Sequence, residues 1–592
     1  MIKRIGIDTE GTGLDPHTAK MLLFTLCDDA GNEYFWKTQE EELPQWVLDM
    51  LVNPDIMVII HNAAFDTKLI KHVYGVVVTN IWDTMLISEL LNLGNKDVKH
   101  KLSDVLKSKY GIVLDKAEIE NFLKGIVTDK GIKMGMEDTR YLLTLQESQE
   151  IEVQHEGIMA NAARIENEVS YVFGQMEYNG MPTNIPLYLS YISRVRVMLR
   201  DVKRTILDIL EYPYTLDLLD DTKIHSDFNL NSSKQKTEAL KRYGIPLDSS
   251  SKEALKGYLY KCKDGTKRIL IQSLLEYSTW QKVTTWKYED AINPVTGRLH
   301  PQYKSLGART GRASSKNPNG QNIMNEAYVL ERQEDGTYIP KETGINFRNP
   351  FEAPQGWKHI GADYSQMELR IYAGVARVAS ILEEYSKENS DLHRQAASYV
   401  FNVPYESIEK DSHERTLGKI LNFAARAYGG GPNAIITAAL NYGVTLTWDE
   451  AKELGTKLLK GDPEGVTWGR EVTEQAKEEG YMWNLAGYRR YIPIELCSPT
   501  RCKNNPIQGL GGAILKEAMI SFQRWIDKVP GSDNVQLISQ IHDELNCIAR
   551  DSWADRTLNE LRRCMLDAGN KYMEPLGVPC AVGSYIADRW QK

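Results

Sequence analysis

The sequence predicts a multidomain α/β protein. Its 592 residues exceed what one hydrophobic core usually supports, and domains of ordinary size would number about three to five. Through residues 1–155, short β-rich runs alternate with helical patterns, which is typical of an α/β domain. Residues 160–300 are helical and polar, and a second α/β region follows them. We therefore expect two α/β parts joined by a helical part.

The elements can be assigned in chain order. The first region contains the strand candidates IKRIGIDT, MLLFTLCD and IMVIIHN, and the helical patterns FDTKLIKHVYG and DTMLISELLN. The later region contains the strand-like WKHIGAD, a long helical stretch over 371–485, and a late hairpin candidate, VQLISQIHDELNCIA. The sequence shows no internal repeat and no low-complexity linker.

Composition excludes a membrane-spanning chain and favours the cytoplasm. No apolar run approaches the roughly 18 residues that a membrane span requires. The first strand candidate begins almost at residue 1, so we expect neither a secretory leader nor a transit peptide. The seven cysteines are scattered without a CxxC pair, which indicates a reducing compartment. Cys497 and Cys502 are close in sequence, but no second pair has matching spacing, and two ordinary thiols are the simpler interpretation.

The formal net charge of −9 means that any basic surface must be local. One such stretch covers residues 234–268, where ten basic residues accompany four acidic ones. By itself, a charge run is more often a solvated helix face than a binding surface. Its meaning therefore depends on the motifs around it.

Four carboxylates in the first region point to a metal site. Asp8 and Glu10 end the first strand candidate, and a strand places residues i and i+2 on the same face. Asp66 follows another apolar run, and Asp138 lies at the head of a helical pattern. Alone, two acids at a strand end are usually solvated. Four converging carboxylates would instead bind two hard divalent cations, the arrangement used to cleave a phosphodiester.

The segments DTE, HNAAFD and WDTM, in this order, resemble the proofreading exonuclease superfamily found in family A DNA polymerases. The resemblance implies that Asp8, Glu10, Asp66 and Asp138 hold two metals, and that Asn62 contacts DNA. The family usually has a tyrosine four residues before its last aspartate, and this chain has Met134 there. A thioether donates no hydrogen bond. Proofreading would then be slower, or another hydroxyl such as that of Tyr141 would substitute.

A second constellation lies in the later region. Asp363 ends the run WKHIGAD, while Asp543 and Glu544 sit where the late hairpin would turn. On one antiparallel sheet these acids could meet and bind two Mg²⁺ ions for phosphoryl transfer. Either aspartate alone could equally be an ordinary turn residue.

The helical segment SHERTLGKILNFAARAYGG carries a cationic stripe. Arg415, Lys419 and Phe423 are spaced four apart, which places them on one helix face. The two cations would suit the phosphates of a nucleoside triphosphate, and the ring its sugar or base. An ordinary amphipathic helix would be the preferred interpretation without the aspartates.

DYSQMELR, RTLGKILNF followed by YG, and QIHDELN resemble motifs A, B and C of family A DNA polymerases, and the resemblance spans essentially the whole chain. It extends to TGRASSKNPNGQNI, DLH, NNPIQG and FNLNSSKQ. The implied fold is an N-terminal α/β exonuclease domain followed by a right-hand polymerase. The implied domains are an exonuclease domain over 1–160, a thumb over 161–300, a first part of the palm over 301–370, fingers over 371–500 and a second part of the palm over 501–592.

The resemblance also implies roles for individual residues. Asp363, Tyr364 and Asp543 would hold the polymerase metals, Glu544 and Lys419 would assist catalysis, and Glu368 would exclude ribonucleotides. The incoming nucleotide would contact Arg415, Lys419, Phe423, Tyr428, Glu368, His393 and Gln366. DNA would contact Arg312, Asn319, Gln321, Gln508 and His542, and donors in the minor groove would check base-pair geometry. The basic stretch would lie in the thumb and grip duplex phosphates.

These assignments predict a DNA-directed DNA polymerase with a 3′-to-5′ exonuclease, acting on primer–template DNA and dNTPs. Each active site would use two Mg²⁺ ions, with Mn²⁺ as a substitute. A non-polymerising nuclease with a DNA-binding C-terminal region is the alternative, and a single-subunit RNA polymerase is disfavoured by Glu368. Because the chain begins at the exonuclease, with no 5′-nuclease domain expected, it resembles phage or prophage replicative polymerases. Accessory processivity factors stay unassigned.

One spacing departs from the family. Phe423 and Tyr428 are separated by four residues, whereas the family usually has three. In a regular α-helix this would turn Tyr428 about 100° away from the stripe. We therefore predict a π-bulge or local unwinding between Phe423 and Gly429 that returns Tyr428 to the template side of the nucleotide pocket. There the resemblance implies that Tyr428 stacks near the template base. The alternative is a regular helix whose course is corrected at the glycines that follow.

Overall fold

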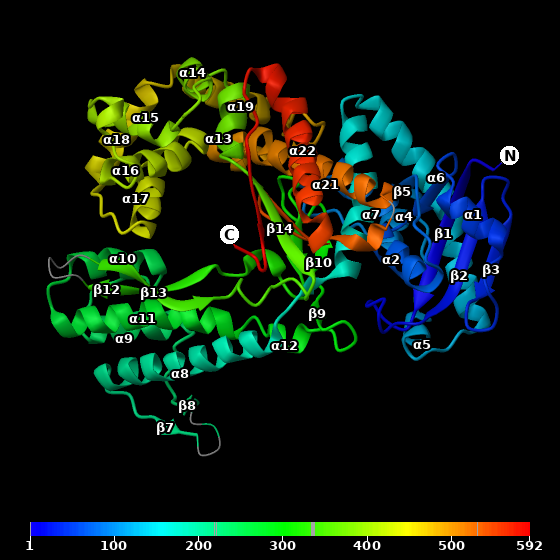
Figure 1. The fold of residues 1–592 in the computed structure, drawn as a ribbon, viewed down its shortest axis with the longest axis horizontal. Helices are drawn as coiled ribbons and strands as arrows, with labels where there is room; N and C mark the ends of the chain where they lie inside the picture. Colours follow the sequence, from blue (N-terminus) through cyan, green and yellow to red (C-terminus); the bar gives the residue numbers. More distant parts are fainter. Residues whose placement is uncertain (1, 218–219, 221, 333–337, 530, 592) are drawn as a thin grey trace.

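The computed structural model describes residues 2–591 except 218–219, 221, 333–337 and 530. Figure 1 shows an N-terminal lobe at one end of the molecule, a sheet near its middle and two helical parts at the other end. No helix in these described ranges is long and apolar enough to cross a membrane.

The N-terminal lobe is built on a five-stranded sheet with the order β3-β2-β1-β4-β5. β1 pairs antiparallel with β2 and parallel with β4, and the strand and helix candidates of this region are confirmed. The strands are β1 Arg4–Gly11, β2 Met21–Asp28, β3 Glu33–Lys37, β4 Met57–Ile60 and β5 Ile81–Asp83. The helices are α1 Gln45–Val52, α2 Ala63–Tyr74, α3 Thr84–Leu91, α4 Leu102–Tyr110, α5 Ile119–Leu123 and α6 Asp129–His155.

Helix α6 begins earlier than the sequence pattern indicates. Asp138 was expected at the head of the helix, but α6 starts at Asp129, where the Thr128 hydroxyl accepts from the Gly131 amide. Gly131 and Gly135 lower helix propensity and so hide this start. Both are needed here, because an added Cβ would lie 2.9 Å from the Phe122 ring and 3.1 Å from Leu23 and Thr25, respectively.

Helix α7 (Met159–Asn179) joins the N-terminal lobe to the rest of the chain. It contacts β5 of that lobe and also β17 (Val535–Ile541) and α21 (Leu510–Lys528). In this joint the buried Lys516 ammonium lies 2.5 Å from the Glu166 carboxylate. The hydroxyl groups of Tyr488 and Ser305 donate to the same carboxylate. A buried ion pair satisfied in this way fixes the relative position of several segments.

A four-stranded antiparallel sheet with the order β17-β18-β14-β19 forms the middle of the molecule. Its strands are β14 Trp357–Tyr364, β17 Val535–Ile541, β18 Glu544–Arg550 and β19 Val582–Ala587. The predicted strand WKHIGAD and the predicted late hairpin are both confirmed. Helix α22 (Ala554–Met573) packs against β14, β18 and β19, and α21 packs against α22.

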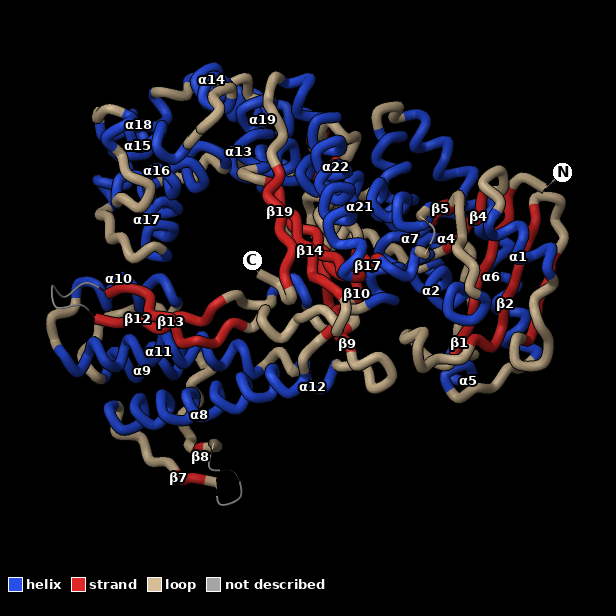
Figure 2. The backbone as a smooth tube through the Cα atoms, in the orientation of Figure 1, coloured by secondary structure: helices blue, strands red, loops and turns tan. Residues whose placement is uncertain are grey.

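The first helical part, which we term the arm, covers residues 185–291. α8 Ile185–Ile209 packs along α11 Gly265–Thr284, and the arm also contains α9 Ser233–Arg242, α10 Lys252–Lys261, α12 Tyr288–Ala291 and the short strands β7 Thr215–Leu216 and β8 Ile224–His225. Nearby are the short strands β6 Met181–Pro182, β9 Arg298–Leu299, β10 Gln302–Lys304 and β11 Ser314–Lys316. A hairpin, β12 Glu326–Arg332 and β13 Tyr338–Asn346, reaches along the arm, as Figure 2 shows, and Arg194 of α8 donates to the Thr343 carbonyl.

The second helical part, which we term the helical lobe, covers residues 367–479. The predicted long helical stretch is broken into α13 Met367–Val375, α14 Ala379–Tyr385, α15 Leu392–Phe401, α16 His413–Leu421, α17 Pro432–Asn441, α18 Trp448–Lys460 and α19 Pro463–Glu479. Capping side chains such as Asp391, Ser412 and Thr447 start these helices. The helical prediction also runs too far, because β15 (Tyr481–Trp483) begins before residue 485 and pairs with β16 (Arg489–Tyr491). α20 (Pro499–Asn504) follows.

A π-helix over Asn422–Ala427 follows α16 directly. The Gly430 amide donates to the Ala424 carbonyl at 2.8 Å, six residues back, and the Gly429 amide donates to the Ala425 carbonyl at 2.9 Å. The extra residue is therefore absorbed within the helix. The predicted bulge between Phe423 and Gly429 is confirmed, and the regular-helix alternative is wrong.

The far ends of the two helical parts touch. α10 of the arm contacts α17 of the helical lobe, so that the arm, sheet and lobe form a ring in Figure 1. At this contact the buried Lys256 ammonium donates to the Leu440 carbonyl at 3.1 Å and to the Asn441 side chain at 3.3 Å. Lys256 was counted with the basic stretch expected to face DNA. The structure corrects this, because its side chain faces α17.

Candidate active sites

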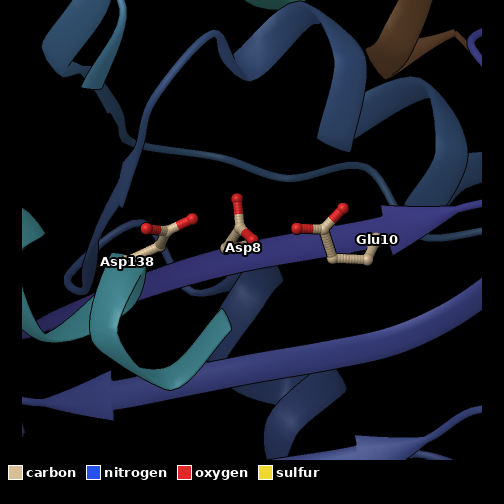
Figure 3. Close-up of side chains that lie close together, drawn as sticks. All are labelled: Asp8, Glu10 and Asp138. Carbon is tan, nitrogen blue, oxygen red and sulfur yellow. The ribbon is translucent and has the colours of Figure 1, made fainter. Parts of the chain in front are cut away.

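Three of the four N-terminal carboxylates converge as expected. Asp8 and Glu10 on β1 and Asp138 on α6 offer oxygens that all lie within 4.8 Å of one another. Figure 3 shows Asp8 between the other two. Asp66, on the first turn of α2, is not one of this group, and its Oδ1 accepts from the amide and hydroxyl of Thr9 at 2.9 and 2.7 Å. Asp66 therefore stands as a neighbouring carboxylate with a fixed orientation.

The electrostatics of this cluster fit a cation site. Burial, and then repulsion from Glu10, raise the pKa of Asp8 well above its usual value. Burial likewise raises the pKa of Glu10 to about 7 and the pKa of Asp66 to about 7. Clustered carboxylates of this kind are stabilised by positive charge. Among the described residues, Asp138 Oδ1 is buried without a hydrogen-bond partner, so it is available to a metal.

Lys116 is a member of this site that the sequence did not reveal. Its ammonium group donates to Asp138 Oδ2, and its charge also favours the ionised forms of Asp8 and Glu10. The lysine lies between α4 and α5 in a segment without helix or strand, so no periodic pattern could have indicated it. Met134, at the expected tyrosine position, is buried in an apolar cluster. Tyr141, the suggested substitute, packs against another apolar cluster.

Asn62 begins α2 in the left-handed conformation, with φ 74°. The backbone amide of Asn62 donates to Asp83 Oδ1, and the Asp83 side chain also caps α3. Asn62 lines a cavity of about 560 Å³ between this lobe and the β10–β11 pair, together with Phe65, Lys101 and Lys304.

The second group of acids lies on the middle sheet. Asp363 is the penultimate residue of β14 and the cross-strand partner of Glu544, which starts β18, so the two side chains share one face. Asp543 occupies the hairpin turn just before β18, and its carbonyl accepts from the Tyr364 amide at 3.3 Å. The sheet therefore brings together the acids that the sequence placed on two distant segments.

Glu544 and Tyr364 are held by other groups. Glu544 Oε1 accepts from the Trp590 indole at 3.0 Å and from the Tyr585 hydroxyl at 3.3 Å. The Tyr364 hydroxyl donates to the Met565 carbonyl of α22, so a metal ligand from Tyr364 would be its backbone carbonyl. The expected direct catalytic role of Glu544 stays a prediction.

Arg312 links the expected DNA contacts to the acids. Its Nη2 lies 2.5 Å from Glu368 Oε1 on α13 and 3.8 Å from Asp543 Oδ1. Burial raises the pKa of Glu368, and Arg312 opposes that rise. A small cavity of about 50 Å³ is lined by Arg312, Gln321 and His542, which the sequence had grouped as DNA contacts. Gln321 Nε2 donates to Gln540 Oε1 at 2.7 Å.

Two further expected DNA contacts, Asn319 and Gln508, lie at a 3-10 turn and in a π-helix, respectively. Asn319 caps a 3-10 turn, and its side chain accepts from Ser315 and from the Gln321 amide. Gln508 lies on a second π-helix, Asn505–Gly509, which the sequence did not reveal. π-helical turns are rare and often occur at functional sites.

The expected nucleotide contacts cluster at the α15–α16 pair. Arg415 Nε donates to Asp391 Oδ2 at 2.7 Å, and the centroids of the His393 and Phe423 rings lie 5.9 Å apart. The Lys419 ammonium lies 5.2 Å from the centroid of the Tyr442 ring. Burial lowers the pKa of His393 to about 4, an effect that Asp391 opposes and that Arg415 and Lys419 reinforce. His393 is therefore neutral at physiological pH.

Two expected contacts lie between this cluster and the sheet. Gln366 precedes α13 with φ 54°, and its Oε1 accepts from the Tyr385 hydroxyl at 2.9 Å. Tyr428 is half-buried and packs against the apolar cluster that includes Met367 and Ile371 of α13. The stacking of Tyr428 near a template base stays a prediction.

The chain is similar to bacterial proteins named DNA polymerase I. DNA polymerase I of Pseudomonas aeruginosa is 29% identical over 382 residues, which cover 62% of this chain and 38% of that protein. DNA polymerase I of Aquifex aeolicus is 27% identical over 557 residues, which cover 90% of this chain and 87% of that protein. The chain thus spans well under half of the first relative's length. Both relatives are bacterial, and a phage origin stays a prediction.

The fold is also that of a solved structure described as the POL domain of Pol1 from M. smegmatis in complex with DNA primer-template and dNTP. The TM-score is 0.81 at 21% identity, over 100% of this chain and 96% of that one. A 3′-5′ exonuclease model matches residues 2–153, and the model for DNA polymerase family A matches residues 219–592. Since the latter covers more than half of the sequence, the chain belongs to DNA polymerase family A.

Proposed function

We propose that this protein is a DNA-directed DNA polymerase with 3′-to-5′ proofreading activity, and that it extends a primer on a template with dNTPs. The observation that carries the proposal is the sheet that places Asp363 and the Asp543 turn on adjacent strands, beside the Arg312–Glu368 pair. A second, separate carboxylate cluster in a lobe that matches a 3′-5′ exonuclease supports the hydrolytic activity.

In the polymerase site, Asp363, Asp543 and the Tyr364 carbonyl would hold two divalent cations, which we take to be Mg²⁺. When bound, these ions would favour the ionised primer 3′-hydroxyl and neutralise the triphosphate. Lys419 and Arg415 would bind the phosphates, and Lys419 would stabilise the departing pyrophosphate. Neutral His393 would donate one hydrogen bond without adding charge.

Glu368 would set sugar specificity. Its side chain is only 12% exposed, and the ion pair with Arg312 fixes its position. A ribose 2′-hydroxyl would meet this carboxylate, whereas a deoxyribose would not. Arg312, Gln321, Gln508 and His542 would donate hydrogen bonds to the minor groove of the primer–template duplex, and Asn319 would position Gln321.

In the N-terminal site, Asp8, Glu10, Asp66 and Asp138 would hold the ions for excision. A water would attack the terminal phosphate, and the bond to the 3′-oxygen of the preceding nucleotide would break. Asn62 and the cavity beside it would accept the unpaired 3′ end, since Lys101 and Lys304 line that cavity.

We assign residues 1–160 to the exonuclease domain, 161–300 to the thumb, 301–370 and 501–592 to the palm, and 371–500 to the fingers. The arm, the middle sheet and the helical lobe support this division. The contacts of α7 with α21 and β17 indicate that the first part of the thumb segment packs with the palm.

Primer extension and excision assays test the proposal. Asp363→Ala or Asp543→Ala should abolish dNTP incorporation and leave degradation of single-stranded DNA intact, because the two metal sites lie in different domains. Asp8→Ala with Glu10→Ala should give the opposite result. Loss of both activities in either folded variant would contradict two independent sites. A wild-type protein that excises but never incorporates would support the non-polymerising nuclease instead.

A further inference from the structure

The N-terminal site contains a cation supplied by the protein itself. The Lys116 ammonium donates to Asp138 Oδ2, while the Lys116 side chain keeps 31% of its surface exposed. It is therefore in contact with a buried carboxylate and also open to solvent and substrate. The four-carbon stem of lysine is flexible, so the ammonium group can move without a change in the backbone.

The position of Lys116 is tied to the residue that replaces the expected tyrosine. Met134 and Phe122 belong to the same buried apolar cluster, and Phe122 anchors the short helix α5. The Glu118 carboxylate, at the start of α5, accepts from the Thr128 hydroxyl at 2.6 Å, which joins this segment to α6. The Lys116 carbonyl in turn accepts from the Ile119 amide. The methionine thus helps to hold the segment that carries the lysine over the carboxylates.

Building on the proposed excision activity, we propose that Lys116 is a catalytic residue of the exonuclease site. When divalent cations occupy the carboxylates, its ammonium group leaves Asp138 and donates a hydrogen bond to a non-bridging oxygen of the scissile phosphate. Water attacks phosphorus, the bond to the 3′-oxygen breaks, and the electron pair leaves with that oxygen. The water loses a proton to solvent and the 3′-oxygen gains one, so Lys116 stabilises the added charge without losing a proton.

Two properties separate this role from that of a counter-ion. A counter-ion competes with metal, so its removal tightens metal binding and leaves the rate at saturating metal unchanged. A catalytic cation also contacts the phosphate in the transition state, so its removal slows excision even when the site is full of metal.

The experiment compares Lys116→Met and Lys116→Arg in an Asp363→Ala, Asp543→Ala background, where the polymerase metal site is removed. Mn²⁺ binding without DNA is followed by electron paramagnetic resonance, and single-turnover excision of single-stranded DNA is measured at saturating Mn²⁺. We expect Lys116→Met to bind Mn²⁺ several-fold more tightly and to excise about 100-fold more slowly. Lys116→Arg keeps the charge and should stay within about tenfold of the parent rate.

The matched control is Lys124→Met, which changes an exposed lysine at the end of α5 and should match the parent in both measurements. Thermal unfolding checks that each variant is folded. Excision by Lys116→Met at the parent rate would overturn the catalytic role, and unchanged Mn²⁺ affinity would overturn the contact with Asp138. Absence of excision in the parent itself would contradict the proposed function rather than the role of Lys116.

Discussion

The Arg312–Glu368 pair connects three of the proposed site roles. The carboxylate holds a guanidinium that also lies 3.8 Å from Asp543, so the proposed sugar gate, duplex contact and metal site share one local network. Removal of either partner leaves a charge in a mostly buried place, which is costly. Substitutions here should therefore affect more than one property.

We expect Glu368→Ala to raise the use of ribonucleotides by about 100-fold or more relative to dNTPs, because the truncation opens space beside the sugar. Glu368→Gln is the matched control, since it keeps the volume and should keep most of the selectivity. The ratio of kcat/KM for dNTP and rNTP incorporation measures this. If the alanine variant retains the wild-type ratio, Glu368 is not the gate.

A buried histidine makes the stability of the folded protein depend on pH. His359 on β14 is 2% exposed, its ring is stacked with that of Tyr585, and burial lowers its pKa to about 3. The folded protein keeps this histidine neutral, whereas the unfolded chain takes up a proton below about pH 6.5. Its contribution to stability is therefore complete above about pH 6.5 and is lost progressively as the pH falls toward 3.

His359→Phe keeps the ring but has no proton to gain. Between pH 7 and pH 5 the wild type should lose about 2 kcal/mol more stability than this variant, because each pKa unit corresponds to about 1.4 kcal/mol. Thermal unfolding across this range measures the difference. Parallel curves for the two proteins would show that His359 takes up its proton equally in the folded and unfolded states.

At the scale of elements, the π-helix that accommodates the extra residue of motif B determines where the Arg426 side chain lies. It turns Arg426 inward, where its Nη1 donates to Asn422 Oδ1 at 2.7 Å and its Nε lies 3.3 Å from Asp462 Oδ2. Both charged side chains are at most 3% exposed, and the Tyr372 hydroxyl donates to the same carboxylate. The bulge thereby ties motif B to the start of α19 and to α13.

Arg426→Met should lower stability by about 3–5 kcal/mol, because it leaves a buried Asp462 carboxylate unpaired. The double variant Arg426→Met with Asp462→Leu should recover a large part of this loss, since neither charge remains. Urea unfolding of the single and double variants forms the test. Additive losses in the double variant would show that the two charges do not interact.

At the scale of the whole molecule, the α10–α17 contact closes the ring of arm, sheet and helical lobe. Lys256 makes this contact by donating to the Leu440 carbonyl and to the Asn441 side-chain oxygen, so hydrogen bonds from one lysine contribute to the closure. The proposed polymerase acids lie on the sheet of this ring, and its closure would retain DNA bound to them.

Lys256→Glu would place a carboxylate against carbonyl oxygens and should open the contact. We expect about tenfold faster dissociation from primer–template DNA, since a hydrogen bond from a charged donor contributes roughly 1.5–3 kcal/mol. Lys252→Glu, at an exposed position on the same helix, makes the same charge change and is the control. Equal dissociation rates for the two variants would mean that phosphate attraction alone governs retention.

Local sequence determined which segments carry the proposed site residues. Asp8, Asp66, Asp363 and Asp543 were found because each follows a strand-like apolar run, and that pattern depends only on neighbouring residues. The bulge in motif B was also predictable, since one extra residue between Phe423 and Tyr428 changes the helical register by a fixed angle.

Tertiary structure alone decided which groups meet across the chain. Lys116 lies in a segment without helix or strand and contacts Asp138. Lys256 was expected to face DNA but contacts α17, and Glu368 forms an ion pair with Arg312. The start of α6 was likewise hidden, because close packing against Phe122 and β2 offsets the low helix propensity of Gly131 and Gly135. Periodicity reports the face that a residue occupies, whereas contacts between distant segments depend on packing and charge in three dimensions.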